Sequence, residues 1–450
     1  MLKRSLVMLV MFAVLFSAAF EVSAQRVNMR GADITIGHWW EDYNVNSVRA
    51  NNDFDERQLD YRKRVLRQNN FTMQEKNIAN WEQMQQRAVL STMAGSPAAN
   101  VFILEAGWAK IMQMRGLLHP VSDSRAVDFA AKRPGDGKVD WSQAIKSAFT
   151  TGGKTYAFGV GYGKMTYPMV IYYNKRLFRE AGLDPDLPYN MQRDGTWTWA
   201  NFEDICKRLT RDIHNRGIID VYALCIDSDL EMHNAFISSN GANYVDVDSR
   251  GRFVNASNRP EFIEALNYLR RLRDAGVMKP RPENANWDWY QNEFVDGRVA
   301  MRIEPQWVTY SLANMRDDWG MVLIPKGPRV NDYVVFADEL ALVIPANSFS
   351  RTQVDQILRG VELWYTPFDD SPNAWKDQYY AHYRDTRAID ETLAIMRNPK
   401  RSLYKFHLWV PGLNPGDIAW QNLVTDLSSA QLVESVEQTW NAIIRDANDI

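Results

Sequence analysis

Residues 33–44 read DITIGHWWEDYN: an alternating apolar run, a glycine, then two adjacent tryptophans and two carboxylates. The alternation over Ile34–Ile36 predicts a short β-strand, and Gly37 predicts that a loop begins at the carboxyl end of that strand. Adjacent indole rings and charges are poor core material. The stretch therefore predicts a buried strand that delivers Trp39, Trp40 and Glu41 to a functional surface.

Short apolar runs alternate with amphipathic helical stretches along most of the chain. Further strands are expected at Val101–Leu104, Met169–Tyr173, Val221–Ile226, Val299–Ile303, Met321–Ile324 and Leu340–Ile344. Thr198 is the expected N-cap of one helix, while Asn258 and Glu261 form the expected capping box of another helix that ends at Gly276. This alternation indicates an α/β fold. After Ile344 the apolar spacing is helical, and no further strand is expected.

The first 24 residues have the three parts of a secretory signal peptide: Lys3 and Arg4, an apolar stretch, and Val22-Ser23-Ala24 as cleavage site. The apolar stretch is shorter than the roughly 20 residues that span a bilayer. Cleavage leaves Gln25 first, with no cysteine to carry a lipid, so we expect a free protein in a Gram-negative periplasm. The net charge then changes from −3 to −4, which gives no electrostatic reason to expect nucleic acid or an anionic membrane as partner.

The two cysteines leave an alternative open. Cys206 lies on the apolar face of an expected helix and Cys225 in an expected strand. An oxidising compartment permits a disulfide between them, and two buried free thiols fit the sequence equally well.

Motifs for phosphate, dinucleotide, metal or serine chemistry are incomplete. GGKT at 152–155 has Ala148 where a phosphate loop has its first glycine, and GVGYGK at 159–164 has Lys164 where a dinucleotide fingerprint has its third. The six histidines show no metal-ligand spacing, and no G-x-S-x-G elbow occurs. We expect no cofactor and no metal. A paired-carboxylate glycosidase stays open, because the fold brings its acid and base together.

The clearest functional signal comes from those of the 16 tryptophans that lie next to acids or amides in the sequence. The clusters are Trp39-Trp40-Glu41-Asp42, Glu105-Ala106-Gly107-Trp108, Trp197-Thr198-Trp199, Trp287-Asp288-Trp289 and Glu304-Pro305-Gln306-Trp307. Four of the five lie at the end of an expected strand or the start of a helix, and open α/β sheets bind ligands at the carboxyl ends of strands. A flat ring covers the apolar face of a pyranose while an acid accepts hydrogen bonds from its hydroxyls. The pattern indicates a sugar.

Core burial is the alternative for each tryptophan. Trp364 and Trp440 fall on apolar helix faces, and Trp199 opens a helix, so all three are expected to be structural. Polar neighbours favour ligand contact for Trp39, Trp40 and Trp307. Glu105, at the end of the run VFIL, fits either interpretation.

Four stretches resemble the successive signatures of one protein family. They are MVIYYNKRLFREAGLD (169–184), GTWTWANFEDICKRLT (195–210), FVDGRVAMRIEPQW (294–307) and VLIPKGP (322–328). They are similar, in order, to extracellular solute-binding proteins of family 1, the carbohydrate-capturing components of ABC importers that include maltose-binding protein. The resemblance covers nearly the whole mature chain.

The resemblance implies a periplasmic binding protein-like fold: two α/β lobes joined by crossing strands, a ligand cleft between them and a mainly helical C-terminal part. Lobe I would comprise residues 25–160 plus about 338–400, and lobe II residues 161–337 plus about 401–450. The glycine-dense stretch 157–165 would be one crossing.

The resemblance also implies where the ligand binds. Trp307 matches the family position that stacks on sugar, Glu304 lies at the strand end before it, and Glu105 and Trp108 match the loop after an earlier strand. With Trp39, Trp40, Glu41 and three residues near the lobe boundaries, Tyr162, Asp338 and Glu339, these form the candidate site. Asn100 stands where the family has an aspartate in its turn, and residues 366–410 match no pattern.

We therefore expect a monomeric, non-catalytic protein that binds a sugar or oligosaccharide and delivers it to an inner-membrane ABC permease. Two alternatives remain. A secreted glycoside hydrolase or lyase would use the same residue types, and a sensor subunit would share the fold.

Overall fold

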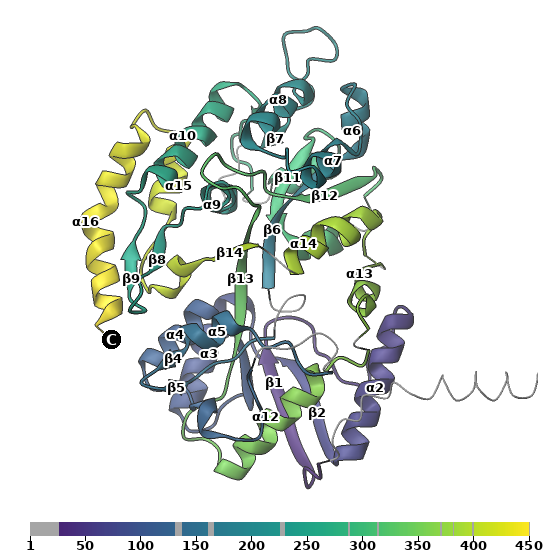
Figure 1. The fold of residues 1–450 in the computed structure, drawn as a ribbon, viewed down its shortest axis with the longest axis vertical. Helices are drawn as coiled ribbons and strands as arrows, with labels where there is room; N and C mark the ends of the chain where they lie inside the picture. Colours follow the sequence, from purple (N-terminus) through teal and green to yellow (C-terminus); the bar gives the residue numbers. More distant parts are fainter. Residues whose placement is uncertain are drawn as a thin grey trace, which may run out of the picture.

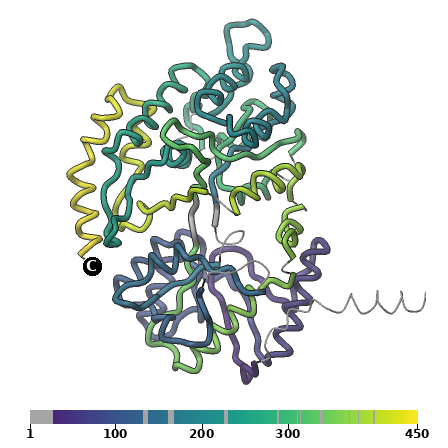
Figure 2. The backbone as a smooth tube through the Cα atoms, in the orientation of Figure 1, coloured from purple at the N-terminus to yellow at the C-terminus, as the bar shows by residue number. Residues whose placement is uncertain are grey.

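The computed structural model describes residues 27–130, 137–160, 166–225, 230–286, 289–312, 315–369, 371–380, 382–397 and 400–449. It consists of two bodies of mixed α/β structure, one above the other in Figures 1 and 2. The body with the N-terminal strands is named lobe I and the other lobe II. The expected α/β fold in two lobes is confirmed.

Lobe I is built on strands with the order β13-β3-β1-β2. β1 (Ala32–His38) pairs in parallel with β2 (Phe71–Asn77) and β3 (Val101–Glu105), while β13 (Val334–Val343) runs antiparallel to β3. Four of the five β3 residues are buried, as a strand between two covered faces requires. The other elements are α2 (Asp53–Asn69), α3 (Trp81–Met93), α4 (Ala106–Met114), η1 (Val121–Asp123), α5 (Gln143–Ala148), the hairpin β4 (Thr150–Thr151) and β5 (Lys154–Thr155), and α12 (Arg351–Tyr365).

Lobe II is centred on β6 (Thr166–Asn174), which β11 (Met301–Pro305) and β12 (Trp319–Leu323) flank in antiparallel pairing. Small pairs are β7 (Leu224–Cys225) with β10 (Met278–Lys279), and β8 (Val245–Val247) with β9 (Phe253–Asn255). The helices are α6 (Lys175–Glu180), α7 (Leu187–Arg193), α8 (Trp199–Leu209), α9 (Leu230–Ser239), α10 (Pro260–Asp274), α11 (Trp289–Val295), η2 (Gln306–Leu312), the π-helical η4 (Ala388–Leu393), α14 (Ala394–Arg397), η5 (Phe406–Trp409), α15 (Gly416–Asn422) and α16 (Ser429–Asn448).

Two paired strands, β13 and β6, lie at the crossing between the lobes. β13 pairs with β14 (Arg401–Tyr404) through Val334–Ala337, with the start of β6 through Ala337–Glu339, and with β3 through Leu340–Val343. A third connection carries η3 (Ala374–Lys376) and α13 (Asp377–Tyr380) past α2, where Arg57 pairs with Asp377 at 2.7 Å (Figure 1). Of the crossing expected at 157–165, residues 161–165 lie outside the described residues.

The local signals that depend on near neighbours were mostly right. Thr198 caps α8 by accepting from the Asn201 amide, and Gly276 follows α10 with φ 69°. Trp199, Trp364 and Trp440 are buried, as expected of structural residues. Cys206 and Cys225 are both buried and are not joined by a disulfide, which decides between the two alternatives.

Several expectations were wrong. No strand was expected after Ile344, but β14 lies there; it was missed because its pairing partner β13 is far away in the sequence. β2 was missed because its residues are largely polar. Within Val221–Cys225 of the expected strand Val221–Ile226, only Leu224–Cys225 form a strand, β7, while Ile226 lies outside the described residues. Asn258 does not cap α10: Arg259 is the N-cap, without a side-chain bond, and the Asn258 amide donates to Glu437 instead.

The proposed division of the chain also needs a change at 385–397. Thr392 accepts from Gln192 and donates to the Met321 carbonyl of β12, and Arg387 donates to Asn190. This segment therefore packs on lobe II, whereas the sequence division placed it in lobe I.

Candidate functional site

The loop after β1 is fixed to the neighbouring strand β2. Tyr43 and Glu75 exchange both backbone hydrogen bonds at 2.9 Å, and the Asn77 amide donates to the Asp42 carboxylate at 2.7 Å. Asn100 ties the other side, since its side chain and backbone both bond to Thr35. Trp39 and Trp40 therefore project from a loop anchored at several points.

Four tryptophans form a continuous ladder at the carboxyl ends of β1, β2 and β3. The ring centroids are 5.0 Å apart for Trp40 and Trp39, 5.7 Å for Trp39 and Trp108, and 5.4 Å for Trp108 and Trp81. At its outer end, the Trp81 indole donates to Glu105 at 3.3 Å. This set of rings with Glu105 is named the tryptophan ladder. The structure brings together four of the residues that the sequence singled out.

Trp81 was missed by sequence reasoning. It is 53% exposed and opens α3 directly after β2. Other tryptophans were selected because they follow expected strands, and the same rule would have found Trp81 had β2 been recognised.

On lobe II, Trp307 stands 50% exposed at the start of η2, just after β11. Glu304 is only 7% exposed, and its carboxylate accepts from the Arg302 guanidinium at 2.8 and 3.2 Å. Burial raises the pKa of Glu304, and Arg302 opposes that shift. The Glu304 carboxylate is thus bonded to Arg302. The Arg302 guanidinium also lies 5.5 Å from the Tyr290 ring centroid.

A second buried ion pair lies in the same lobe. Lys405 is 3% exposed and donates to both carboxylate oxygens of Glu231 at 2.9 Å. Glu231 in turn acts electrostatically on Glu304. Arg302, Glu304, Glu231 and Lys405 are named the charge network; its two positive and two negative groups cancel.

Strand register places the ladder and Trp307 at the same junction. Glu105 pairs with Leu340, the adjacent Glu339 pairs with Thr166, and Pro305 pairs with Met169, three residues further along β6. Three residues of a strand span about 10 Å. The carboxyl ends of β3 and β11 therefore approach the junction between the lobes from opposite sides.

The remaining candidates have no such arrangement. Glu41 is exposed, and Asp338 and Glu339 are described through their backbone, which pairs with β6. Tyr162 lies outside the described residues. Within the described ranges, no group of three or more His, Cys, Asp or Glu side chains could hold a metal, and no helix is long and apolar enough to cross a membrane.

The lobes also touch away from the crossing strands. A Cβ added to Gly107 of α4 would lie 1.9 Å from the Leu408 carbonyl oxygen of η5, and Phe149 of lobe I lies 6.1 Å from the Trp409 ring. Gly107 immediately precedes Trp108 of the ladder. Backbone contact between the lobes therefore occurs one residue from the candidate site.

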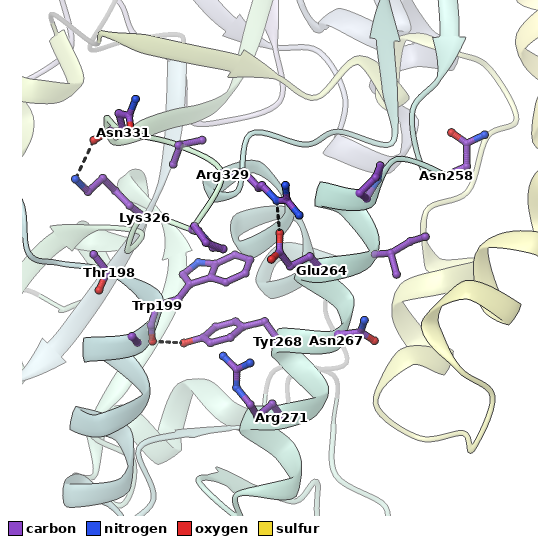
Figure 3. A pocket seen from close by; sticks show the side chains of 16 residues that line it. Thr198, Trp199, Asn258, Glu264, Asn267, Tyr268, Arg271, Lys326, Arg329 and Asn331 are labelled. Atoms are coloured by element: carbon purple, nitrogen blue, oxygen red, sulfur yellow. Dashed lines mark hydrogen bonds and ion pairs between the residues drawn. The ribbon is translucent and has the colours of Figure 1, made fainter.

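A groove of about 820 Å³ lies apart from the ladder, between α8, α10 and Lys326–Asn331 of lobe II (Figure 3). Its rings, Trp199 and Tyr268, stack at 4.3 Å but are nearly fully buried. Arg329 pairs with Glu264 and Arg271 with Glu203, while Lys326 donates to the Asn331 carbonyl. The two rings of the groove are therefore covered, and Arg329, Arg271 and Lys326 are engaged within the protein.

Comparison with protein families matches residues 60–355 to the family described as "Bacterial extracellular solute-binding protein". No curated protein sequence matches the chain.

Solved structures show the same fold at low identity. The cyclic alpha-maltosyl-1,6-maltose binding protein from Arthrobacter globiformis is 17% identical, covers 92% of this chain and 100% of its own, and gives a TM-score of 0.64. An ABC substrate-binding protein from Listeria monocytogenes, in complex with cycloalternan, is 15% identical with 92% and 99% covered and a TM-score of 0.62. UgpB from Mycobacterium tuberculosis, in complex with glycerophosphocholine, is 17% identical with 92% and 99% covered and a TM-score of 0.61.

Proposed function

The chain belongs to the bacterial extracellular solute-binding protein family, and on that premise we propose that it captures a sugar or oligosaccharide in the periplasm and delivers it, chemically unchanged, to an inner-membrane ABC permease. The observation that carries the proposal is the tryptophan ladder with Glu105 at the junction of the lobes. We assign ligand contact to Trp39, Trp40, Trp81, Trp108 and Glu105 on one side and Trp307 on the other.

The charges near these residues favour a neutral ligand. Glu105 bonds to the ladder, and Glu41 and Asp42 directly follow Trp40 in the sequence; carboxylates accept hydrogen bonds from hydroxyls and repel a phosphate. The charge network on lobe II is internally neutral. A saccharide fits these conditions better than the phosphodiester bound by the Mycobacterium tuberculosis neighbour. The binding proteins among the neighbours give the hydrolase alternative no support.

A thermal-shift screen tests the proposal with saccharides of increasing length and with glycerophosphocholine. A ligand at about 100 times its Kd stabilises the protein by about 2.7 kcal/mol. We expect this shift with a saccharide, and chromatography should return the saccharide intact. A shift with glycerophosphocholine alone would overturn the ligand class, and cleaved saccharide would overturn the transport role.

A further inference from the structure

His38 is a buried residue next to the ladder to which no role has yet been given. It ends β1, is fully buried, and stacks on Trp40 with ring centroids 4.0 Å apart and planes 4° from parallel. Its Nδ1 accepts from the Trp40 backbone amide at 3.3 Å. The imidazole therefore contacts both the ring and the backbone of Trp40.

The second ring nitrogen of His38, Nε2, lacks a hydrogen bond within the described part of the chain. It lies 4.0 Å from a Glu75 oxygen, while the other Glu75 oxygen accepts from the Trp364 indole at 2.7 Å. A phenylalanine would fill this space without an orphaned buried nitrogen, which is costly. Compared with phenylalanine, histidine adds an acceptor for the Trp40 backbone amide. An asparagine or glutamine side chain could also accept, but it would lack the stacked ring.

We infer that His38 is the positioning residue of the tryptophan ladder: its neutral imidazole holds Trp40, and through it Trp39, Trp108 and Trp81, in the orientation that meets the ligand. The part of this inference that concerns the ligand rests on the proposed function, whereas the ordering of the ladder by His38 does not depend on it.

The protonation state of His38 follows from its surroundings. Burial lowers the pKa of His38 to about 4, against the attraction of Glu75 on β2 and Asp42 in the loop. Arg62 of α2 lies beyond these groups, 4.0 Å from the Trp364 ring centroid. Nδ1 is thus free to accept at neutral pH, and a proton placed there would break the bond to Trp40.

The test uses two complementary variants of the full mature protein. His38→Phe keeps the stacked ring and loses the acceptor; His38→Asn keeps an acceptor near the Nδ1 position and loses the stack. His214→Asn, an exposed histidine on lobe II, is the control. Near-UV circular dichroism reports coupled indoles without any ligand, and far-UV spectra of the same samples report folding.

We expect the near-UV signal of the wild type and of His214→Asn to change with a midpoint near pH 4, and both His38 variants to lack this step. Titration with the stabilising saccharide should show about tenfold weaker binding for each variant, the size of one lost interaction. An acid step that persists in both variants, or wild-type affinity in both, would overturn the inference. If no saccharide binds, the proposed function fails while the spectra still decide the role of His38.

Discussion

Lobe I meets the junction with a series of packed rings, whereas the described part of lobe II brings to it the half-exposed ring of Trp307 and the buried ion pair of Arg302 and Glu304. The ladder from Trp40 to Trp81 has consecutive centroids 5.0–5.7 Å apart and one acid at its end. In lobe II, Trp307 is half exposed, while Arg302 and Glu304 are 6% and 7% exposed and bonded to each other.

The two arrangements differ in what a substitution should disturb. Aromatic rings contribute through contact area and stacking, and an exposed ring can be lost with little harm to folding. A buried ion pair is costly to desolvate, and removal of one partner leaves the other charged and unpaired. We therefore expect changes in the ladder and at Trp307 to affect binding, and changes in the charge network to affect folding.

The largest expected effect tests the charge network. Arg302→Met leaves the Glu304 carboxylate buried without its partner, and should lower the free energy of unfolding by about 3–5 kcal/mol. Chemical denaturation at pH 7 measures this loss. Lys400→Met is the matched control, because Lys400 pairs with Asp332 at 79% and 45% exposure, where about 0–1 kcal/mol is expected. Equal effects of the two substitutions would contradict a special role for the buried pair.

The next effect tests Trp307 as a binding residue. Trp307→Ala removes stacking worth about 0.5–1.5 kcal/mol and ring burial worth about 2 kcal/mol, so binding should weaken about a hundredfold. Calorimetric titration and a thermal melt on the same protein separate binding from folding. The control is Trp319→Ala, a fully buried ring, which should cost about 3–5 kcal/mol of stability. Normal affinity with a much lower melting temperature would place Trp307 in the core.

Local sequence patterns could predict those parts of the fold that depend on near neighbours. The buried strands β1, β3, β6, β11 and β13 were found because their apolar residues need no distant partner to be recognised. β2 and β14 were missed, since their strand conformation comes from pairing with β1 and β13. The same reason explains Trp81, whose position next to the ladder depends on β2.

The grouping of rings in the candidate site was partly predictable for a similar reason. Tryptophans at strand ends identified Trp39, Trp40 and Trp108, because parallel strands deliver their carboxyl ends to one edge. Glu304 was expected to face the ligand, but the side chain two residues earlier, Arg302, turns to the same carboxylate. Strand alternation puts Arg302 and Glu304 on the same face, but it does not show that the guanidinium bonds to this carboxylate or that Lys405 and Glu231 lie nearby, and so the charge network needed the structure.

Acid stability offers a smaller effect, which His407 of lobe II should show. Burial lowers the pKa of His407 to about 3, whereas the unfolded value is near 6.5. The folded state binds fewer protons, so this contribution is complete above about pH 6.5 and is lost as the pH falls toward 3. His407→Phe should therefore unfold less easily than the wild type by about 2 kcal/mol at pH 5.

At pH 7 the same variant should be no less stable, because both His407 nitrogens lack hydrogen-bond partners in the described structure. Urea unfolding at pH 5 and pH 7 measures both values. A constant difference between the variants at the two pH values would show that His407 is protonated to the same degree in both states.

The smallest effect concerns the contact between the lobes beside the ladder. Gly107 has an ordinary helical position in α4, but an added Cβ would lie 1.9 Å from the Leu408 carbonyl oxygen and 2.9 Å from its carbon. Neither backbone can yield as a side chain would, so Gly107→Ala should move η5 away from α4. Overpacking of this kind costs about 1–3 kcal/mol, partly offset by about 0.5–1 kcal/mol from the better helix propensity of alanine. The net loss of stability should be about 1 kcal/mol, and the lobes should sit further apart, which small-angle scattering measures as a larger radius of gyration.

Because Trp108 is the next residue, binding should weaken only if the ligand needs both lobes at once. Unchanged affinity with a larger radius would mean that the ladder binds without lobe II, and would make Trp307 dispensable.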